Sequence, residues 1–366
     1  MQEREESMST LKKIAEKAGV SESTVSRVLN NPNYRCSSPE KRNLIWKTAI
    51  DMNYVPNEAA RNLKMGVRSS NERTCSISVL MTRTEAPQTD PFFSELLRIV
   101  ETEIHSQFCI LSNVWYMPVL SNERKCRAVN LDQLIDNMVT ESDVRIDGLV
   151  VIGKCAREAL VKLKKKFKNV VSINRNPTNH DVDEVTCDGS KVAELAVEHL
   201  ISLGHTDIGY IGECHNEARY RGYMNTLTRH QVEFEPAYVV ETRQTEEDGY
   251  EAMKKMLQSD AIPTGIYCAN DITAIGVLKC LGRAKNRYFS ISVVSSDDIE
   301  QAQYTTPMLT TVALPKEEMG KFAVYLLVDR IKGNHKNTVK MELEGCLIKR
   351  GSCKPLMDSS WSDYSI

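Results

Sequence analysis

The sequence predicts an α/β protein, with an all-α helix-turn-helix head followed by a core of two doubly wound parallel-sheet subdomains. Two observations predict it. The first 66 residues hold short amphipathic helical segments, and after Cys75 strand-like and helix-like segments alternate, a pattern typical of parallel sheets covered by helices on both faces. Because the chain has 366 residues, a head of about 60 leaves about 300 for one large or two modest domains.

The head begins with a predicted helix, a tight turn and a second helix between Thr10 and Asn30. The apolar stripe of the first helix, at helical spacing, consists of Leu11, Ile14, Ala15 and Ala18. Gly19 suits the end of this helix, since glycine accepts left-handed backbone geometry. Ser21 suits the N-cap of the second helix, and Val20 and Val25 are spaced as a hydrophobic staple.

The second helix is predicted to bury one face and to expose a polar one. Its inward residues are Val25, Val28 and Leu29, and its outward residues are Glu22, Ser23, Ser26 and Arg27. A third helix follows the cap Ser38-Pro39; its apolar residues are Leu44, Ile45, Ala49 and Met52.

Charge favours nucleic acid as the partner of this head. Between Ser9 and Lys64 there are ten basic and five acidic side chains, although the whole chain has a formal charge of −2. Small three-helix domains also occur without DNA binding, but a basic head on an acidic body suits a phosphate-binding module. A helix with outward polar side chains after a tight turn is the arrangement that enters the DNA major groove.

The head sequence resembles a known family. The pattern Thr10-Leu-x-x-Ile-Ala-x-x-Ala-Gly-Val-Ser-x-x-Thr-Val-Ser-Arg-Val-Leu-Asn30 is similar to the DNA-binding signature of the lactose/galactose repressor family. Tyr54-Val-Pro-Asn57 followed by Ala60-Arg-x-Leu63 is similar to the hinge of that family. The resemblance implies a helix-turn-helix domain over residues 9–66, with a hinge helix at 57–65, and a linker at 67–74.

The resemblance implies roles for individual residues of the head. Base edges would be contacted by Glu22, Ser23 and Arg27. A guanidinium can bind guanine O6 and N7 bidentately, whereas Glu22 could either accept from cytosine or favour the helix dipole. The expected phosphate contacts, which set register only, are Thr10, Ser21, Thr24, Ser26 and Asn30. In the hinge, Asn57, Ala60 and Leu63 would face the minor groove, with Leu63 either a wedge that kinks DNA or an ordinary packing residue.

The core resembles the same family over residues up to about 352. Its matching segments include Asp90-Pro-Phe-Phe-Ser-Glu-Leu-Leu, Asp147-Gly-Leu-Val-Val, Arg219-x-x-Gly-Tyr, Asn270-Asp and Asp297-Asp. Within the family the chain is most similar to the evolved-β-galactosidase repressor subgroup. The segment from Tyr116 to Asn130 has no counterpart among the landmarks of the family.

The resemblance implies a periplasmic-binding-protein-like core at 75–353, with a tail at 354–366. Three chain crossings, expected near Leu203, Val312 and Lys336, would divide it into one subdomain at 75–203 plus 313–336 and another at 204–312 plus 337–353. Strand candidates include residues 76–81, 148–152, 169–173, 208–211, 265–269 and 291–295, and helix candidates include 92–106, 191–203, 249–258 and 272–281. Ligands of such folds bind beyond the carboxyl ends of the strands.

The resemblance also implies a small-molecule site between the subdomains. The candidate effector residues are Phe92, Arg175, Asp188, Arg219, Asn270 and Asp297. Arginine, asparagine and aspartate can bind sugar hydroxyls while an aromatic face stacks on C–H groups. Arg175 and Asp188 are included because they lie at apparent strand ends. The other four have alternatives: Arg219 as a surface ion-pair partner, Asn270 and Asp297 as caps or turn residues, and Phe92 as core. His205 is expected to be structural, and the lysines from 162 to 168 a solvated helix face.

Several classes of protein are disfavoured. The eleven cysteines form no Cys-x-x-Cys pair or metal spacing, which suits a reducing cytoplasm without a metal or cofactor. No apolar run reaches the roughly 18 residues of a membrane span, and the first eight residues lack a signal-peptide core. No phosphate-binding glycine loop, nucleophile elbow or His-Glu-x-x-His motif suggests an enzyme.

We therefore expect a dimeric cytoplasmic regulator of transcription that binds double-stranded operator DNA under the control of a sugar. We expect it to repress a carbohydrate operon, with a galactoside as the candidate effector. The alternatives are an activator or global catabolite regulator, and a sugar-binding transport protein. The DNA-binding head argues against transport. No leucine heptads follow Lys354, so a coiled-coil tetramer is not expected.

Overall fold

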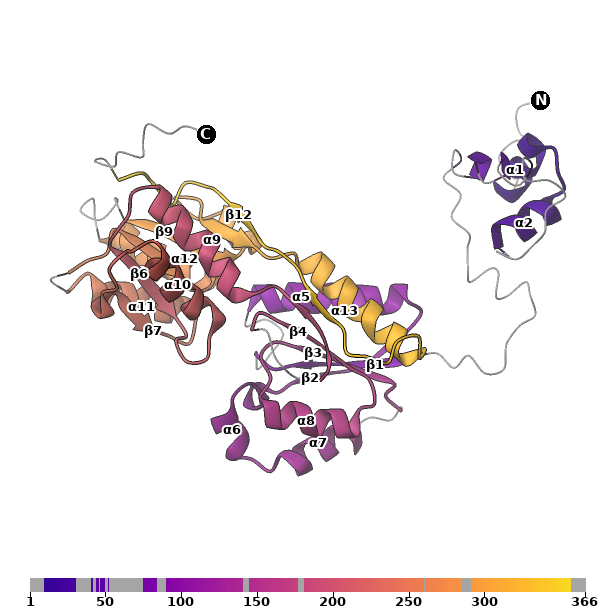
Figure 1. Cartoon of the computed structure of the whole chain (residues 1–366), viewed down its shortest axis with the longest axis horizontal. Coiled ribbons are helices and arrows are strands. Elements are labelled where there is room, and N and C mark those ends of the chain that lie inside the picture. The colour runs from indigo at the N-terminus through magenta and orange to yellow at the C-terminus, as the bar shows by residue number, and fades with distance from the viewer. Residues whose placement is uncertain are drawn as a thin grey trace. The chain divides into compact units, whose positions relative to one another are not determined.

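The computed structural model describes residues 10–30, 41, 44–45, 47–49, 52, 75–83, 90–140, 145–176, 181–259, 261–284 and 291–356. The chain divides into two compact units, Met1–Arg73 and Thr74–Ile366. Figure 1 draws both, and each is described here by itself.

The first unit contains the helix pair expected from the sequence. Helix α1 spans Thr10–Ala18 and helix α2 spans Glu22–Asn30. Gly19 between them has a φ of 61°, in the left-handed region that glycine adopts at little cost. Ser21 Oγ accepts a hydrogen bond from the Thr24 backbone N–H at 3.2 Å, which is the N-cap interaction predicted for α2.

A small apolar core joins these helices to the segment after residue 40. Its buried members are Ile14, Ala15, Ala18, Val25, Val28, Leu29, Ile45 and Ala49. Leu44, one of the apolar residues of the third predicted helix, lies outside this core and is 44% exposed. Ile45, Thr48, Ala49 and Met52 instead form the inward stripe of this segment, and Leu44 lies one helical position outside it.

The second unit holds two six-stranded sheets. The first sheet has the order β11-β5-β4-β3-β1-β2, and every adjacent pair is parallel. Its strands are β1 (Ser76–Met81), β2 (Ile110–Tyr116), β3 (Gly148–Ile152), β4 (Val170–Asn174), β5 (Asp183–Thr186) and β11 (Lys340–Glu342).

Helices cover both faces of the first sheet (Figure 1). On one face lie α5 (Pro91–Ser106) and α13 (Lys316–Ile331), and on the other lie α6 (Glu123–Arg127), α7 (Leu131–Thr140) and α8 (Arg157–Lys166). Strand β1 is buried on both sides, since Val79 belongs to the cluster under α5 and Leu80 to the cluster under α7 and α8. Continuous apolar strands of this kind are expected in a parallel sheet.

The second sheet has the order β12-β10-β9-β8-β6-β7 and is parallel except for the β10–β12 pair. Its strands are β6 (Ile208–Gly212), β7 (Val239–Glu241), β8 (Gly265–Cys268), β9 (Ser292–Asp297), β10 (Thr310–Ala313) and β12 (Cys346–Ile348). Helices α9 (Gly189–Ser202) and α10 (Ala218–Arg229) pack together, as do α11 (Glu246–Met256) and α12 (Asp271–Arg283). Short 3-10 turns lie at Pro118–Ser121, Pro236–Tyr238 and Glu300–Gln303.

The chain passes between the sheets after β5, after β10 and between β11 and β12. The expected crossings near Leu203 and Lys336 are therefore misplaced. Helix α9 packs on β9 and β10 of the second sheet, so the first crossing precedes it. Lys340 of β11 pairs with Glu184 of β5 in the first sheet, so the last crossing follows it. We call residues 75–187 with 316–342 the first subdomain, and 189–313 with 346–353 the second subdomain.

This architecture confirms the predicted fold class: helix-turn-helix head and two doubly wound, essentially parallel sheets. In the parts of the chain that the structure covers, no helix combines the length and apolar character needed to cross a membrane.

Candidate DNA-reading surface and ligand cleft

Helix α2 exposes the three side chains predicted to contact bases. Glu22, Ser23 and Arg27 are all exposed, while Val25 and Val28 on the opposite face are buried. The cap Ser21 is exposed as well, and its hydroxyl lies 2.8 Å from that of Thr24. The amphipathic spacing of the sequence therefore places these polar groups on one accessible helix face, as a major-groove contact requires.

Other predicted DNA contacts are less fully described. Ser26 is half-buried on α2. Thr10 begins α1 and Asn30 ends α2. The expected hinge residues Asn57, Ala60 and Leu63, and the linker at 67–74, lie outside the described residues.

Four of the six candidate effector residues end a strand or follow one within two residues, and the other two, Phe92 and Arg219, lie in the first turns of α5 and α10. Arg175 follows β4 of the first subdomain, and Asp297 ends β9 of the second. The Arg175 guanidinium forms an ion pair with the Asp297 carboxylate, and both side chains are buried. Burial raises the pKa of Asp297, while Arg175 and Arg219 act in the opposite direction. Asp297 has a φ of 119°, which is strained for a residue with a side chain.

Arg219 is a buried cation rather than the surface ion-pair partner that remained as an alternative. Its Nε donates to Glu217 Oε1 at 2.9 Å, and its terminal nitrogens donate to the Ala269 carbonyl and, at 3.2 Å, to Gln244 Oε1. Burial alone would raise the pKa of Glu217, but the charge and hydrogen bond of Arg219 lower it to about 2. Gly222 permits this placement of α10, because a Cβ there would collide with the Ser190 carbonyl oxygen of α9.

Asn270 acts as a helix cap, as its alternative interpretation proposed. Its Oδ1 accepts from the Thr273 backbone N–H at 3.1 Å at the start of α12. Its Nδ2 donates to the Gln244 carbonyl at 3.3 Å. Gln244 therefore contacts both Arg219 and Asn270, and its own Nε2 is buried without a hydrogen-bond partner among the described residues. This amide group can therefore donate a hydrogen bond to a ligand that binds beside these two candidate effector residues.

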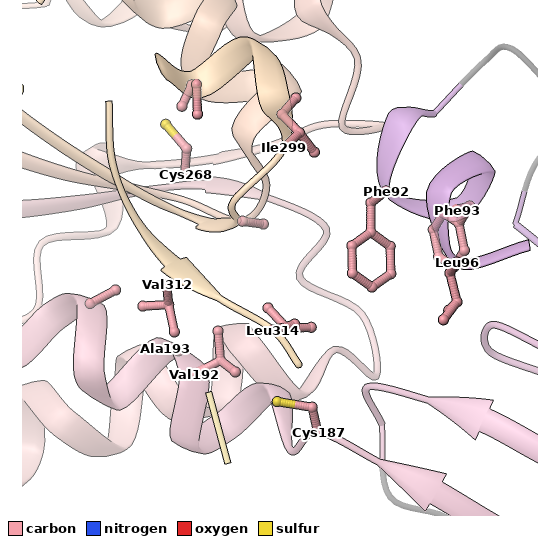
Figure 2. Packing of buried hydrophobic residues seen from close by; sticks show 14 of the residues in the cluster. Phe92, Phe93, Leu96, Cys187, Val192, Ala193, Cys268, Ile299, Val312 and Leu314 are labelled. Atoms are coloured by element: carbon pink, nitrogen blue, oxygen red, sulfur yellow. The ribbon is translucent and has the colours of Figure 1, made fainter. Parts of the chain in front are cut away.

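Phe92 belongs to the apolar core and also touches the polar site. Its side chain is 1% exposed, and the Arg175 guanidinium lies 4.6 Å from its ring centroid, within cation–π range. Figure 2 shows Phe92 on α5 on the side that faces Leu314 and Cys187, which lie in the segments crossing between the subdomains. Core packing and site formation are thus combined in one residue.

Asp188 and His205 make contacts that stabilise the fold. Asp188 caps α9, accepting from the Ser190 backbone N–H at 2.8 Å. His205 is buried, with its ring nitrogens near Thr264 Oγ1 at 3.0 Å and Ser292 Oγ at 2.9 Å. Burial lowers the pKa of His205, which agrees with the expected structural role.

Further contacts across the cleft were not identified from the sequence. Arg83 after β1 pairs with Glu213 after β6 at 3.0 Å, and Lys154 after β3 lies 3.6 Å from the same carboxylate. The Ala218 backbone N–H donates to Asn176 Oδ1 at 2.7 Å. The signal that could have found them is positional, since each residue lies within two residues after a strand or at the start of a helix, at the edge of the sheet where ligands bind.

The inner part of the cleft is almost filled by these side chains. The space lined by Phe92, Arg175 and Arg219 has a volume of about 20 Å³, room for about one water molecule. A larger cavity of about 850 Å³ adjoins it, and Asn174 and Asn176 line both. The described residues contain no cluster of metal-ligating side chains. The arrangement suits reversible binding of a polar molecule.

The comparisons with known proteins agree with this architecture. Residues 10–57 match the family described as bacterial regulatory proteins, lacI family, and residues 197–353 match the periplasmic binding protein-like domain. The HTH-type transcriptional repressor PurR of Pasteurella multocida is 30% identical over 354 residues, covering 95% of this chain and 99% of the relative.

Solved structures show the same fold. A LacI family transcriptional regulator from Enterococcus faecium with bound ribose is 26% identical, with a TM-score of 0.63, covering 77% of this chain and 99% of that one. The lac repressor dimer bound to operator and the anti-inducer ONPF is 22% identical, with a TM-score of 0.65, covering 94% and 99%.

The head and the two-sheet core define a DNA-binding regulator of transcription and not an enzyme. The chain belongs to the lacI family of bacterial regulatory proteins.

Proposed function

We propose that the chain is a repressor of a carbohydrate-utilisation operon, and that a sugar bound between the two subdomains controls its affinity for operator DNA. The observation that carries this proposal is the Arg175–Asp297 ion pair, which joins the subdomains at the carboxyl ends of their sheets. A repressing role is supported by the PurR relative, which is named a transcriptional repressor.

The chemistry of the cleft supports a polyhydroxylated ligand. A sugar that separates Arg175 from Asp297 would offer hydroxyl groups to both charges, and these groups can replace the lost ion-pair contacts. The unpartnered Nε2 of Gln244 would gain an acceptor. Phe92 would supply an apolar face for sugar C–H groups. The Enterococcus faecium regulator contains ribose, and the subgroup resemblance favours a galactoside here.

The head would supply sequence specificity. Arg27 would bind a guanine in the major groove, with Ser23 and Glu22 contacting neighbouring bases. The hydroxyl groups of Ser21 and Thr24, which lie together at the start of α2, would contact phosphates with Thr10, Ser26 and Asn30. The hinge residues Asn57, Ala60 and Leu63 would enter the minor groove.

Exposed apolar side chains support a homodimer. Phe108 is 63% and Ile110 54% exposed, and Ile110 begins β2, the edge strand of the first sheet. Tyr304 and Met308 are exposed on the second subdomain. A second copy would cover such side chains. A dimer would place two heads on the half-sites of a pseudopalindrome, in the cytoplasm where bacterial DNA lies.

Control would follow from a coupling between two equilibria. Sugar binding would change the relative arrangement of the subdomains, and the dimer would transmit this change to the hinges. Because coupling free energy is reciprocal, operator DNA must alter sugar affinity by the same factor as sugar alters operator affinity.

The test begins with operator DNA selected by the full-length protein from a random library. Its affinity is then titrated against galactose, lactose, ribose and cellobiose, their phosphorylated derivatives and the corresponding sugar acids. We expect at least one compound to weaken operator binding by about 5- to 150-fold, the usual range of allosteric coupling. If none changes operator affinity, the proposed control is wrong. A reporter gene behind the selected operator separates repression from activation.

A further inference from the structure

The cavity of about 850 Å³ at the mouth of the cleft has a distinctive charge distribution. One wall comes from the first subdomain, with side chains of α6 and the start of α8. The other comes from the second subdomain, with the loop after β6, the start of α10 and the end of β7. A ligand in this cavity would therefore touch both subdomains.

Four arginines line the cavity without an acidic partner. They are Arg124, Arg127, Arg157 and Arg221. Within the part of the chain that the structure covers, none of them has a carboxylate oxygen within 4.0 Å. The first three belong to one wall and Arg221 to the other. Guanidinium groups on opposite walls can bind the same anion.

The carboxylates of the same cavity are already engaged. Glu213 pairs with Arg83 at 3.0 Å and Lys154 at 3.6 Å. Glu241 contacts His215 Nδ1 at 2.7 Å. Glu123 Oε1 accepts from the backbone N–H of Arg157 at 2.8 Å. The described lining thus carries five cationic side chains against three carboxylates, which leaves the cavity an excess of positive charge.

We propose that this cavity binds the anionic group of the effector, so that the effector is a phosphorylated or carboxylated sugar. Arginine suits this task because its planar fork binds phosphate or carboxylate bidentately. Asn174 and Asn176, which line both the cavity and the inner pocket, would bind the sugar hydroxyls between the anion and Asp297. The inference rests on the proposed function, since it specifies the ligand of the same cleft.

The position of α6 supports a specificity role for this wall. Arg124 and Arg127 lie in the segment from Tyr116 to Asn130, which matches no landmark of the family. The Cys126 side chain between them is buried against the first subdomain, which holds the helix on that wall. The arginines are thus presented by a chain segment without a counterpart among the landmarks of the family, and a buried residue holds that segment in place.

The experiment measures binding by the full-length protein with titration calorimetry at two salt concentrations. The probes are galactose, glucose and ribose, their terminal phosphates, galacturonate, glucuronate and inorganic phosphate. We expect an anionic sugar to bind at least about tenfold more tightly than its neutral parent, since its charged group adds charge-assisted hydrogen bonds to the arginines. Added salt should lower the affinity for the anionic compounds more than the affinity for the neutral ones.

The variant Arg124→Gln/Arg221→Gln removes one cation from each wall. It should lower the affinity for the anionic compound by about tenfold or more and leave the affinity for the neutral parent unchanged. The matched control Arg98→Gln/Lys255→Gln removes two positive charges from exposed positions on α5 and α11, and should leave both affinities unchanged. Thermal unfolding of all three proteins checks that folding is retained.

Each outcome decides the matter. Equal or tighter binding of neutral sugars, with control of operator affinity retained, contradicts this inference and leaves the proposed function intact. The inference is also contradicted, and the proposed function left intact, if the cavity variant and its control have the same affinities for the anionic compound. If every anionic probe, inorganic phosphate included, fails to bind, the inference is wrong. If no compound of either kind alters operator affinity, the proposed function fails as well.

Discussion

The guanidinium of Arg175 in the first subdomain is paired with the carboxylate of Asp297 in the second, and Phe92 lies against the same guanidinium at 4.6 Å. A buried ion pair stabilises a structure only modestly, because its attraction must offset the cost of removing both charges from water. The pair is therefore suited to exchange: a ligand that hydrogen-bonds both groups can separate them without leaving either charge uncompensated.

Asp297→Ala tests this exchange. The substitution should abolish the effect of ligand on operator affinity while operator binding persists, because the head is a separate compact unit. It leaves Arg175 buried without its carboxylate, which should cost about 3–5 kcal/mol of unfolding free energy. The neutral pair Arg175→Gln/Asp297→Asn should recover most of that stability without recovering the ligand response. An Asp297→Ala protein that still responds to ligand would exclude Asp297 from the site.

Arg27→Ala tests base recognition by α2. We expect a loss of about 1–3 kcal/mol on the selected operator and relaxed specificity at one base pair. Lys17→Ala, which removes an exposed positive charge from the end of α1, serves as the comparison and should not change base preference. Fluorescence anisotropy on operator and random DNA separates the two. If Arg27→Ala lowers the affinity for operator and for random DNA equally, Arg27 contacts phosphate and does not read a base.

Leu63→Ala tests the predicted minor-groove wedge. The head should remain folded, because its core consists of residues between Ile14 and Ala49, but DNA bending should decrease. Energy transfer between dyes at the two ends of an operator fragment measures the bend. An unchanged bend at saturating protein would show that Leu63 is an ordinary packing residue.

Ile110→Asp tests the proposed dimer. A carboxylate on the exposed start of β2 should oppose burial of this edge by a second copy, since an unpaired charge is costly to bury. Sedimentation velocity should show a shift from dimer to monomer and about the same thermal stability. Val161→Asp, at an exposed apolar position on α8, is the control. If both variants remain dimeric, the interface lies elsewhere.

The environment of the Asp271 carboxyl group predicts that the free energy of unfolding depends on pH. Its carboxylate is buried at the start of α12, accepting from Thr311 Oγ1 at 2.6 Å and the Ile299 backbone N–H at 2.8 Å. Burial raises its pKa from 3.8 to about 7, and Asp297 adds to this rise. The folded state therefore holds a proton between these pH values that the unfolded state has lost, and the unfolding free energy should fall as pH rises from about 4 to 7.

Asp271→Asn should remove this fall, which we expect to be on the order of a few kcal/mol. Asparagine can keep the hydrogen bonds by accepting from Ile299 and donating to the hydroxyls of Ser295 and Thr311. Asp136→Asn at an exposed position of α7 is the control. Urea unfolding of the core at several pH values measures the effect, and parallel pH profiles of the Asp271→Asn variant and the unmodified protein would contradict it.

Periodicity predicted most of the head and of the buried strands. The stripe from Ile14 to Ala18 and the outward face around Arg27 follow directly from helical spacing. Strands β1 and β3 have the predicted bounds, because every residue of each strand is buried and most of them are apolar. Strand β11 gave no such signal: it is short, only partly buried, and exists because its backbone pairs with β5.

The candidate site was predictable residue by residue but not as a set of contacts. Family resemblance indicated Arg219 and Asn270, yet their shared partner Gln244 is distant in sequence and follows a three-residue strand. The pairing of Arg175 with Asp297 depends on how two subdomains meet, which no local pattern encodes. The position expected for the first crossing was wrong for a similar reason. Helix α9 is amphipathic whichever sheet it covers, so its sequence pattern does not show on which sheet it packs.

The most direct test of ligand control is the affinity of the effector for the protein with and without bound operator, measured by calorimetry with the compound that changes operator affinity most. We expect operator DNA to lower effector affinity by the same factor as the effector lowers operator affinity. An effector affinity that is identical with and without operator would contradict it.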